Sequence, residues 1–204
     1  MTEETFEVEI SELELKYSAN DIKMSDFVTF AKSLNPIKEL EVASWDYYYS
    51  GEGLPFEFIR FRNGTDPEIT IKIKTTDKNN NNRIEIELPL NSKVSEWRVA
   101  KFVGLFGFKE NFRIYKHCMI FWYDKLDIVY YTVFNQNMEE IGRYCEVERD
   151  KSVKGGTREE AWTLIKEMEQ KMSVLGIVPQ NRMRRSLWEL FRKDIKKGVA
   201  SDGV

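Results

Sequence analysis

Charged residues alternate with apolar residues along several short segments of the sequence. Glu12-Leu-Glu-Leu-Lys16 is one such segment and Arg83-Ile-Glu-Ile-Glu87 is another. Because side chains at positions i, i+2 and i+4 of a β-strand share one face, each segment would place its charges on one side of a sheet. These rows contain seven cations, Lys16, Arg60, Arg62, Lys72, Lys74, Arg83 and Lys116, and six glutamates, Glu12, Glu14, Glu85, Glu87, Glu146 and Glu148.

A sheet with one solvated face gives a similar pattern in any single strand. A merely solvated face would, however, also use Ser, Thr, Asn and Gln, whereas these rows are almost purely Arg, Lys and Glu. Some rows carry one sign only, as Lys72 and Lys74 do, and neighbouring like charges are destabilising unless something compensates them. We therefore expect the compensation to come from across a cavity or from a ligand.

A barrel closed around these rows would have an ionic interior and an apolar exterior covered by helices. Buried ions are tolerated when they are paired or bound. Clustered Arg and Lys suit a polyanion, whereas clustered carboxylates suit Mg²⁺ or Mn²⁺, which share their ligand shell with phosphate oxygens and water. The rows therefore predict a site for metal-bound polyphosphate.

The elements that would position these residues follow from the same periodicity. Period-2 segments bounded by Gly, Pro, Asn and Asp predict eight strands, near residues 6–17, 40–50, 56–63, 68–76, 82–90, 110–124, 126–135 and 142–150. Amphipathic stretches predict helices at about 25–34, 94–106, 157–175 and 184–196. The predicted fold class is α+β, an eight-stranded antiparallel β-barrel with flanking helices.

Four local signals define the helices further. Thr157 followed by Glu160 is a capping box, and Gly176 stands at the expected C-cap. The apolar side of the helix near 94–106 would be formed by Trp97, Val99, Phe102, Val103 and Phe106. The basic last helix would pack through Leu187, Leu190 and Phe191.

Length and composition limit the class of protein. The 204 residues favour one domain over 1–204, with core strands at about 6–150 and C-terminal helices at about 157–197. An apolar content of 42% excludes disorder, and a net charge of −3 gives no general attraction to nucleic acid or anionic lipid. We therefore expect no membrane partner and no sequence-specific nucleic-acid binding, and the sequence does not predict an oligomeric state.

Further features of the sequence bear on location and chemistry. Cys118 and Cys145 are the only cysteines, which fits a reducing cytoplasm. The acidic start at Met1 does not resemble a signal peptide, and no apolar run reaches the length of a membrane span. His117 is the only histidine, so neither a zinc site nor a Cys-His nucleophile is indicated. We expect a cytoplasmic protein.

The ordered motifs resemble those of the CYTH or triphosphate tunnel metalloenzyme superfamily, which includes class IV adenylate cyclases, thiamine and inorganic triphosphatases, and RNA triphosphatases. E-x-E-x-K on the first strand is its hallmark. Further matches follow in the family's order: Asp46-Tyr-Tyr-Tyr49, Phe58-Ile-Arg60-Phe-Arg62, Thr70-Ile-Lys72-Ile-Lys74, Arg83-Ile-Glu-Ile-Glu87, and Lys116 with Glu146-Val-Glu148. The resemblance covers about residues 6–150. Ser186-Leu-Trp-Glu-Leu-Phe191 is similar to the family's C-terminal region.

The resemblance implies a hydrolase of a triphosphate that depends on Mg²⁺ or Mn²⁺ and releases orthophosphate. It implies that the seven cations clamp phosphate oxygens: Lys16, Arg60, Arg62, Lys72, Lys74, Arg83 and Lys116. It likewise implies that Glu12, Glu14, Glu146 and Glu148 hold the metal, and that Glu85 and Glu87 complete a second metal site or orient the attacking water.

The sequence departs from the family pattern in ways that keep alternatives open. Cys118 stands where the family often has an arginine two places after its lysine. Class IV cyclases often carry a His-Phe pair before the first motif, and Thr5-Phe6 here favours hydrolysis. The alternatives are a cyclase that makes cyclic AMP and pyrophosphate from ATP, and a non-catalytic module that binds polyphosphate or nucleotide. The partner would be inorganic triphosphate, a free nucleotide, thiamine triphosphate or an RNA 5′ end.

Overall fold

The computed structural model describes residues 13–51, 56, 58–74, 83–90, 94–149 and 157–192. Within these, the backbone alone is described at 74, 83, 84 and 158. The described strands are β1 (Glu14–Ser18), β2 (Lys38–Ser50), β3 (Phe58–Asn63), β4 (Glu68–Lys74), β5 (Arg83–Pro89), β6 (Lys109–Trp122), β7 (Leu126–Phe134) and β8 (Glu140–Arg149). The helices are α1 (Met24–Ser33), α2 (Glu96–Gly104) and α3 (Arg158–Met172), with 3₁₀ turns η1 (Ser173–Leu175) and η2 (Pro179–Asn181).

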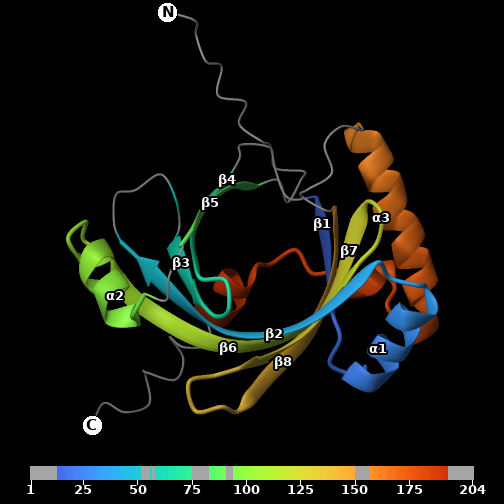
Figure 1. Ribbon diagram of the computed structural model, residues 1–204, viewed down its shortest axis with the longest axis horizontal. Helices are drawn as coiled ribbons and strands as arrows, with labels where there is room; N and C mark the ends of the chain where they lie inside the picture. The colour runs from blue at the N-terminus through green and yellow to red at the C-terminus, as the bar shows by residue number, and fades with distance from the viewer. Residues whose placement is uncertain are drawn as a thin grey trace, which may run out of the picture.

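All eight strands belong to one antiparallel sheet, in the order β1-β8-β7-β6-β2-β3-β4-β5. The sheet curls into a half-barrel, with helices flanking its convex side (Figure 1). The long strands β2 and β6 pair along their length and shift register between Tyr48 and Tyr49, where the extra residue favours bending. The predicted α+β fold is confirmed, although the described residues leave the sheet open between edge strands β1 and β5.

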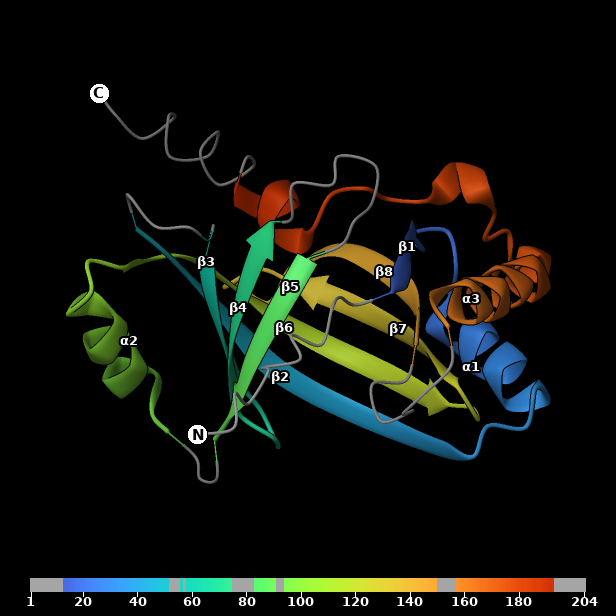
Figure 2. The same ribbon diagram turned by 90° about the horizontal axis from the view of Figure 1, so that it is seen from above.

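The convex face carries the apolar positions of the alternating strands, and α1 and α3 cover one end of it. Phe27 of α1 and Ile165 of α3 are fully buried in a cluster with Tyr130 of β7 and Val147 of β8. Figure 2 shows α1 and α3 together on one side of the sheet and α2 at the opposite end. This packing turns the charged positions of the same strands toward the concave side, because neighbouring residues in a strand face opposite ways.

The predicted helix ends are largely confirmed. Glu160 N donates to Thr157 Oγ1 at 3.2 Å and Thr157 N donates to Glu160 Oε2 at 2.7 Å, which completes the capping box of α3. The 3₁₀ turn η1 links the end of α3 to Gly176, whose φ of 79° is the left-handed conformation that glycine favours. A last helical segment begins at residue 187, later than predicted, because Ser186 and Glu189 form a second capping box before it.

The apolar side predicted for α2 is only partly buried. Val99 and Val103 pack against the convex face of the sheet, with Tyr47 and Phe61 in the same cluster. Trp97, Phe102 and Phe106 are instead more than half exposed. The prediction is wrong for these three because the short helix meets the sheet along one narrow stripe. No helix in the described ranges has the length and apolar character needed to cross a membrane.

Candidate functional site

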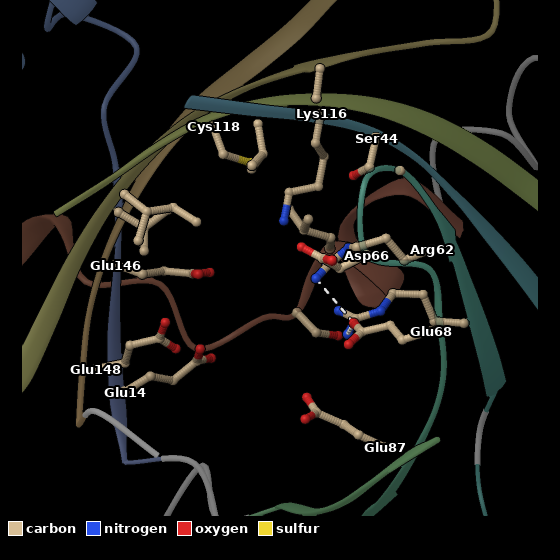
Figure 3. A pocket seen from close by; sticks show the side chains of 18 of the residues that line it. Glu14, Ser44, Arg62, Asp66, Glu68, Glu87, Lys116, Cys118, Glu146 and Glu148 are labelled. Atoms are coloured by element: carbon tan, nitrogen blue, oxygen red, sulfur yellow. Dashed lines mark hydrogen bonds and ion pairs between the residues drawn. The ribbon is translucent and has the colours of Figure 1, made fainter. Parts of the chain in front are cut away.

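The concave face of the sheet contains a cavity of about 380 Å³. Strands from both ends of the sheet line it, together with the segment around Trp188. Nine of the residues predicted from the sequence line this cavity: Glu14, Lys16, Arg60, Arg62, Lys72, Glu87, Lys116, Glu146 and Glu148. The charged rows of separate strands therefore meet in one place, as Figure 3 shows for several of them.

Four other predicted residues are not among the described residues of the lining. The Glu85 side chain is almost fully buried and pairs with two of the lining cations, Arg60 and Lys72. Lys74 and Arg83 are opposite each other in the β4–β5 ladder, where only their backbone is described. Glu12 lies outside the described residues.

Strand register explains which charges meet. In the β1–β8 ladder, Glu14 is opposite Glu148 and Lys16 is opposite Glu146. In the β4–β5 ladder, Lys72 is opposite Glu85. Directly opposite residues in an antiparallel pair have side chains close enough to interact. The antiparallel pairing therefore forms ion pairs between Lys16 and Glu146 and between Lys72 and Glu85, and it places the carboxylates of Glu14 and Glu148 side by side.

We call Glu14, Glu146 and Glu148 the carboxylate wall. Lys16 Nζ lies 2.8 Å from Glu146 Oε1 and 3.5 Å from Glu14 Oε1. Tyr131 Oη also donates to Glu146 Oε1, at 2.7 Å. Burial alone would raise the pKa of Glu146, but the charges of Lys16 and Lys116 and these hydrogen bonds lower it to about 2. Glu146 is therefore a carboxylate at any physiological pH.

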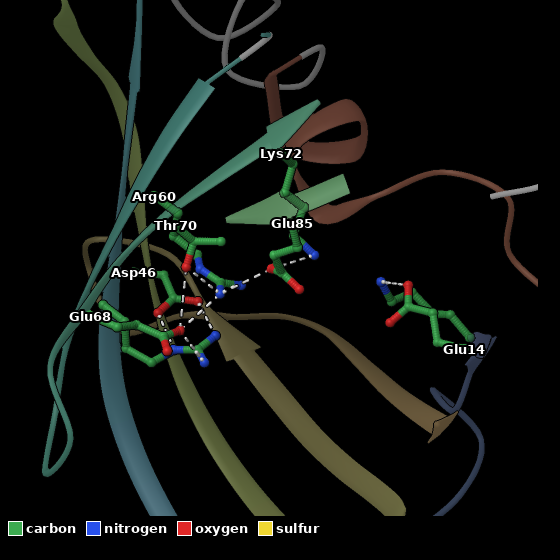
Figure 4. A network of polar contacts seen from close by, with 9 residues as sticks. Glu14, Asp46, Arg60, Glu68, Thr70, Lys72 and Glu85 are labelled. Carbon is green, nitrogen blue, oxygen red and sulfur yellow. Dashed lines mark hydrogen bonds and ion pairs between the residues drawn. The ribbon is translucent and has the colours of Figure 1, made fainter. Parts of the chain in front are cut away.

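Opposite this wall, β3 presents two guanidinium groups, which we call the guanidinium wall (Figure 4). Arg62 donates from Nε to Asp46 Oδ1 at 2.9 Å and from Nη2 to Asp46 Oδ2 at 3.1 Å. Arg60 Nη2 donates to Glu68 Oε1 and to Thr70 Oγ1, both at 2.9 Å. Arg62 Nη1 also donates to Glu68 Oε1, at 3.1 Å. The network holds both guanidinium groups in fixed positions at the cavity.

Asp46 is the fully buried anchor of this network. Burial would raise its pKa, but the charges of Arg62, Arg60 and Lys116 outweigh that effect and lower the pKa to about 2. The bidentate geometry suits the planar guanidinium, which a lysine could not reproduce. Asp46 therefore fixes the orientation of Arg62 rather than binding a ligand itself.

Lys116 differs from the other described cations of the cavity. Its side chain is buried and points into the cavity between the two walls (Figure 3). Its Nζ lies 4.2 Å from the centroid of the Tyr131 ring. Within the described part of the chain, no carboxylate forms an ion pair with it. A buried cation that lies near carboxylates without a direct ion pair to any of them is a favourable place for an anionic ligand.

The carboxylate wall has the donor atoms of a metal site. The described residues contain no group of three or more Asp, Glu, His or Cys side chains arranged to hold a metal ion. Glu14, Glu146 and Glu148 nevertheless lie along one side of the cavity, and Glu12 belongs to the same sequence row (Figure 3). An all-oxygen donor set has the chemistry that Mg²⁺ and Mn²⁺ prefer.

Several contributors to the site were not assigned a role from the sequence. Asp46 belongs to a quoted motif, but its bidentate contact depends on the β2–β3 register, in which Asp46 is opposite Arg62. Glu68 shares the parity of Thr70 and Lys72 along β4, so strand periodicity alone was sufficient to find it. Tyr131 lies in a strand whose residues are nearly all buried, and nothing in the sequence distinguishes its inward position.

Two neighbouring residues of β6 lie on opposite sides of the strand. Cys118 lines the cavity two positions from Lys116, and burial raises the pKa of its thiol, so this position supplies no charge. His117, of opposite parity, lies away from the cavity, where its Nε2 is 2.6 Å from Glu41 Oε1. The cavity is therefore less cationic at Cys118 than the family pattern implies.

Comparisons with solved structures identify the fold. A conserved hypothetical protein from Pyrococcus furiosus superposes with a TM-score of 0.67 at 22% identity, over 88% of this chain and 99% of that one. A proposed adenylate cyclase from Vibrio parahaemolyticus gives a TM-score of 0.63 at 12% identity, over 89% and 97%. A chain of the Schizosaccharomyces pombe Mediator head module gives 0.59 at 12% identity, over 80% and 95%.

Sequence comparison adds no assignment. No protein-family model matches the chain, and no curated protein matches it. The structural likenesses, all below 25% identity, concern the fold. The chain therefore shares its fold with these solved structures, one of which is described as a proposed adenylate cyclase.

Proposed function

We propose that this chain is a divalent-metal-dependent hydrolase of a triphosphate substrate that releases orthophosphate. The observation that carries the proposal is the buried ammonium group of Lys116, which faces the cavity between a guanidinium wall and a carboxylate wall. A linear polyphosphate has several negative oxygens and would contact Lys116 and the guanidinium wall together. Such contacts stabilise both the bound ground state and the charge of the transition state.

The carboxylates divide into two proposed roles. Glu14, Glu146 and Glu148, with Glu12, would hold Mg²⁺ or Mn²⁺, which when bound neutralises charge on the phosphate oxygens. Glu87 lines the cavity and would orient the water that attacks the terminal phosphorus in line with the leaving oxygen. Glu85 lies 3.0 Å from Lys72 Nζ and 3.6 Å from Arg60 Nη2, so it would position these two cations rather than the water.

A single assay distinguishes the proposed activity from its alternatives. Purified protein is incubated with Mg²⁺ or Mn²⁺ and with tripolyphosphate, ATP or 5′-triphosphorylated RNA, and the products are separated by chromatography. Orthophosphate is the expected product. Cyclic AMP with pyrophosphate would identify a cyclase instead. Binding measured by calorimetry without any product would identify a non-catalytic module.

The metal assignment gives a separate prediction. Glu148→Gln should raise the metal concentration needed for half-maximal turnover by at least about tenfold, because an amide oxygen carries no charge to offer the cation. Glu39→Gln, which changes an exposed glutamate that pairs with Lys32, is the matched control and should leave the metal requirement unchanged. An unaltered metal requirement in Glu148→Gln would show that the carboxylate wall does not hold the ion.

A further inference from the structure

Helix α2 carries large apolar side chains on the side that points away from the sheet. Leu105 is 83% exposed, and Trp97, Phe102 and Phe106 are each more than half exposed. These four residues lie within ten consecutive positions, at α2 and just beyond its end, and we call them the α2 ridge. Isolated exposed apolar residues are normal on a protein surface, whereas a cluster of large ones marks an interaction site. The α2 ridge is therefore a candidate docking surface.

The opposite side of the helix holds the α2 ridge in place. Val99 and Val103 are almost fully buried in an apolar cluster with residues of β2 and β3. Within the ridge, Phe102 and Phe106 contact each other edge to face, with ring centroids 5.4 Å apart. Binding costs less when the contacting side chains are already restricted before the partner arrives. The ridge is therefore a preorganised surface.

The exposed area of the α2 ridge matches the area that a stable dimer buries. Four large side chains that are each more than half exposed leave roughly 500 Å² of apolar surface on one copy. Two copies packed ridge to ridge would bury roughly 1,000 Å² of apolar surface, and apolar atoms supply a little over half of a typical interface. With its polar rim, the contact would reach about 1,600 Å², which is the usual size of a stable protein–protein interface.

The charges of α2 favour a second copy of the chain over an anionic lipid surface. They are of both signs, with Glu96 in the first turn, Arg98 after it and Lys101 in the last turn. Helices that bind membranes are rich in Lys and Arg on their polar face, and the net charge of −3 gives the whole chain no attraction to anionic lipid. Antiparallel packing of two α2 helices would bring the acidic first turn of each toward the basic last turn of the other, with their dipoles antiparallel.

We propose that α2 forms the interface of a homodimer, in which the α2 ridges of two copies pack against each other around a two-fold axis. A two-fold contact uses the same surface on both partners, so one apolar ridge per chain is sufficient. Phe102 lies near the middle of the ridge and would face its own counterpart in the second copy. Figure 2 shows α2 at one end of the molecule, away from α1 and α3. Because α2 lies on the convex side of the sheet, the contact would leave the cavity uncovered (Figure 1).

Sedimentation velocity over a range of protein concentrations tests the proposal. At high concentration the wild-type protein should have twice the 24.2 kDa mass of one chain. Leu105→Ser combined with Phe106→Ser should raise the dissociation constant at least about 30-fold, the effect of losing one strongly contributing interface residue. Ile37→Ser is the matched control, because Ile37 is 72% exposed but lies between α1 and β2, and it should leave the dissociation constant unchanged. Thermal unfolding should confirm that the variants are folded.

Two charge variants test whether the partner is a second copy. Phe102→Glu and Phe102→Lys should each be monomeric alone, because the two-fold axis would bring like charges together, and an equimolar mixture should form the heterodimer. A wild-type protein that stays monomeric at every concentration, or a mixture that does so, would overturn the proposal. So would a monomeric wild-type protein that sediments with phosphatidylserine vesicles through Leu105 and Phe106, because the ridge would then bind lipid. These experiments use no triphosphate, so their outcome is independent of the proposed function.

Discussion

Arg62→Leu is expected to lower the free energy of unfolding by about 3–5 kcal/mol, because it leaves the fully buried carboxylate of Asp46 without its bidentate partner. Urea denaturation at pH 7 measures the change. The matched control is Arg113→Leu, which breaks an ion pair with Glu110 that lies at the surface and should cost less than about 1 kcal/mol. Equal losses in the two variants would contradict the anchoring role of Asp46.

The same pair predicts how stability depends on pH. The pKa of Asp46 is lowered to about 2 in the folded protein, compared with about 3.9 in an unfolded chain. The stabilisation is therefore fully present above about pH 4 and is lost as the pH falls toward 2. In Arg62→Leu the pKa is no longer held down, so the deficit relative to the wild type should shrink over this interval. A deficit that stays constant from pH 5 to pH 2.5 would show that Asp46 is not its source.

In contrast to Arg62→Leu, Lys116→Met should cause a large loss of activity and little loss of stability. Lys116 has no ion pair in the described part of the chain, so methionine leaves no partner carboxylate buried alone. The proposed phosphate contact is lost, and turnover should fall by roughly 10²–10³, the range reported for removal of one donor that stabilises developing negative charge. Steady-state kinetics and thermal unfolding on the same samples measure the two effects.

Two comparisons make the Lys116 result interpretable. Lys125→Met changes an exposed lysine between β6 and β7 and should affect neither property. If the protein proves not to hydrolyse triphosphates, calorimetry with tripolyphosphate still reports whether Lys116 binds the anion. A Lys116→Met variant that unfolds as readily as Arg62→Leu would mean that Lys116 stabilises the fold, and one that binds and turns over normally would exclude it from the site.

Strand periodicity predicted much of the sheet, and it predicted the face on which the described charged side chains of the cavity lie. Parity is a local property, so Arg60, Lys72 and Glu85 could be sorted onto one face without knowledge of the fold. Partner choice is not local, because it depends on register between strands that are distant in sequence. For that reason, the sequence could not predict that Arg62 contacts Asp46 or that Arg60 and Arg62 both donate to Glu68.

The helices show the same division between local and tertiary information. The capping box at Thr157 is a local signal, and it was predicted correctly. The exposure of Trp97 and Phe102 could not be predicted, because hydrophobic periodicity identifies an apolar side but not the width of the surface that receives it. The order of the described strands, with β1 and β5 at the two edges of the sheet, likewise cannot be predicted from a pattern that describes one strand at a time.

The residues that line the cavity come from segments that are far apart in the sequence. Lys16 from the first described strand meets Glu146 from the last, and Phe58 contacts Trp188 near the C-terminal end of the described chain. Contacts of such long sequence separation require the closure of large loops, which makes folding slow. The cations of β1 to β4 are enclosed only when β8 and the segment around Trp188 are also in place. The cavity is therefore complete only in the fully folded chain.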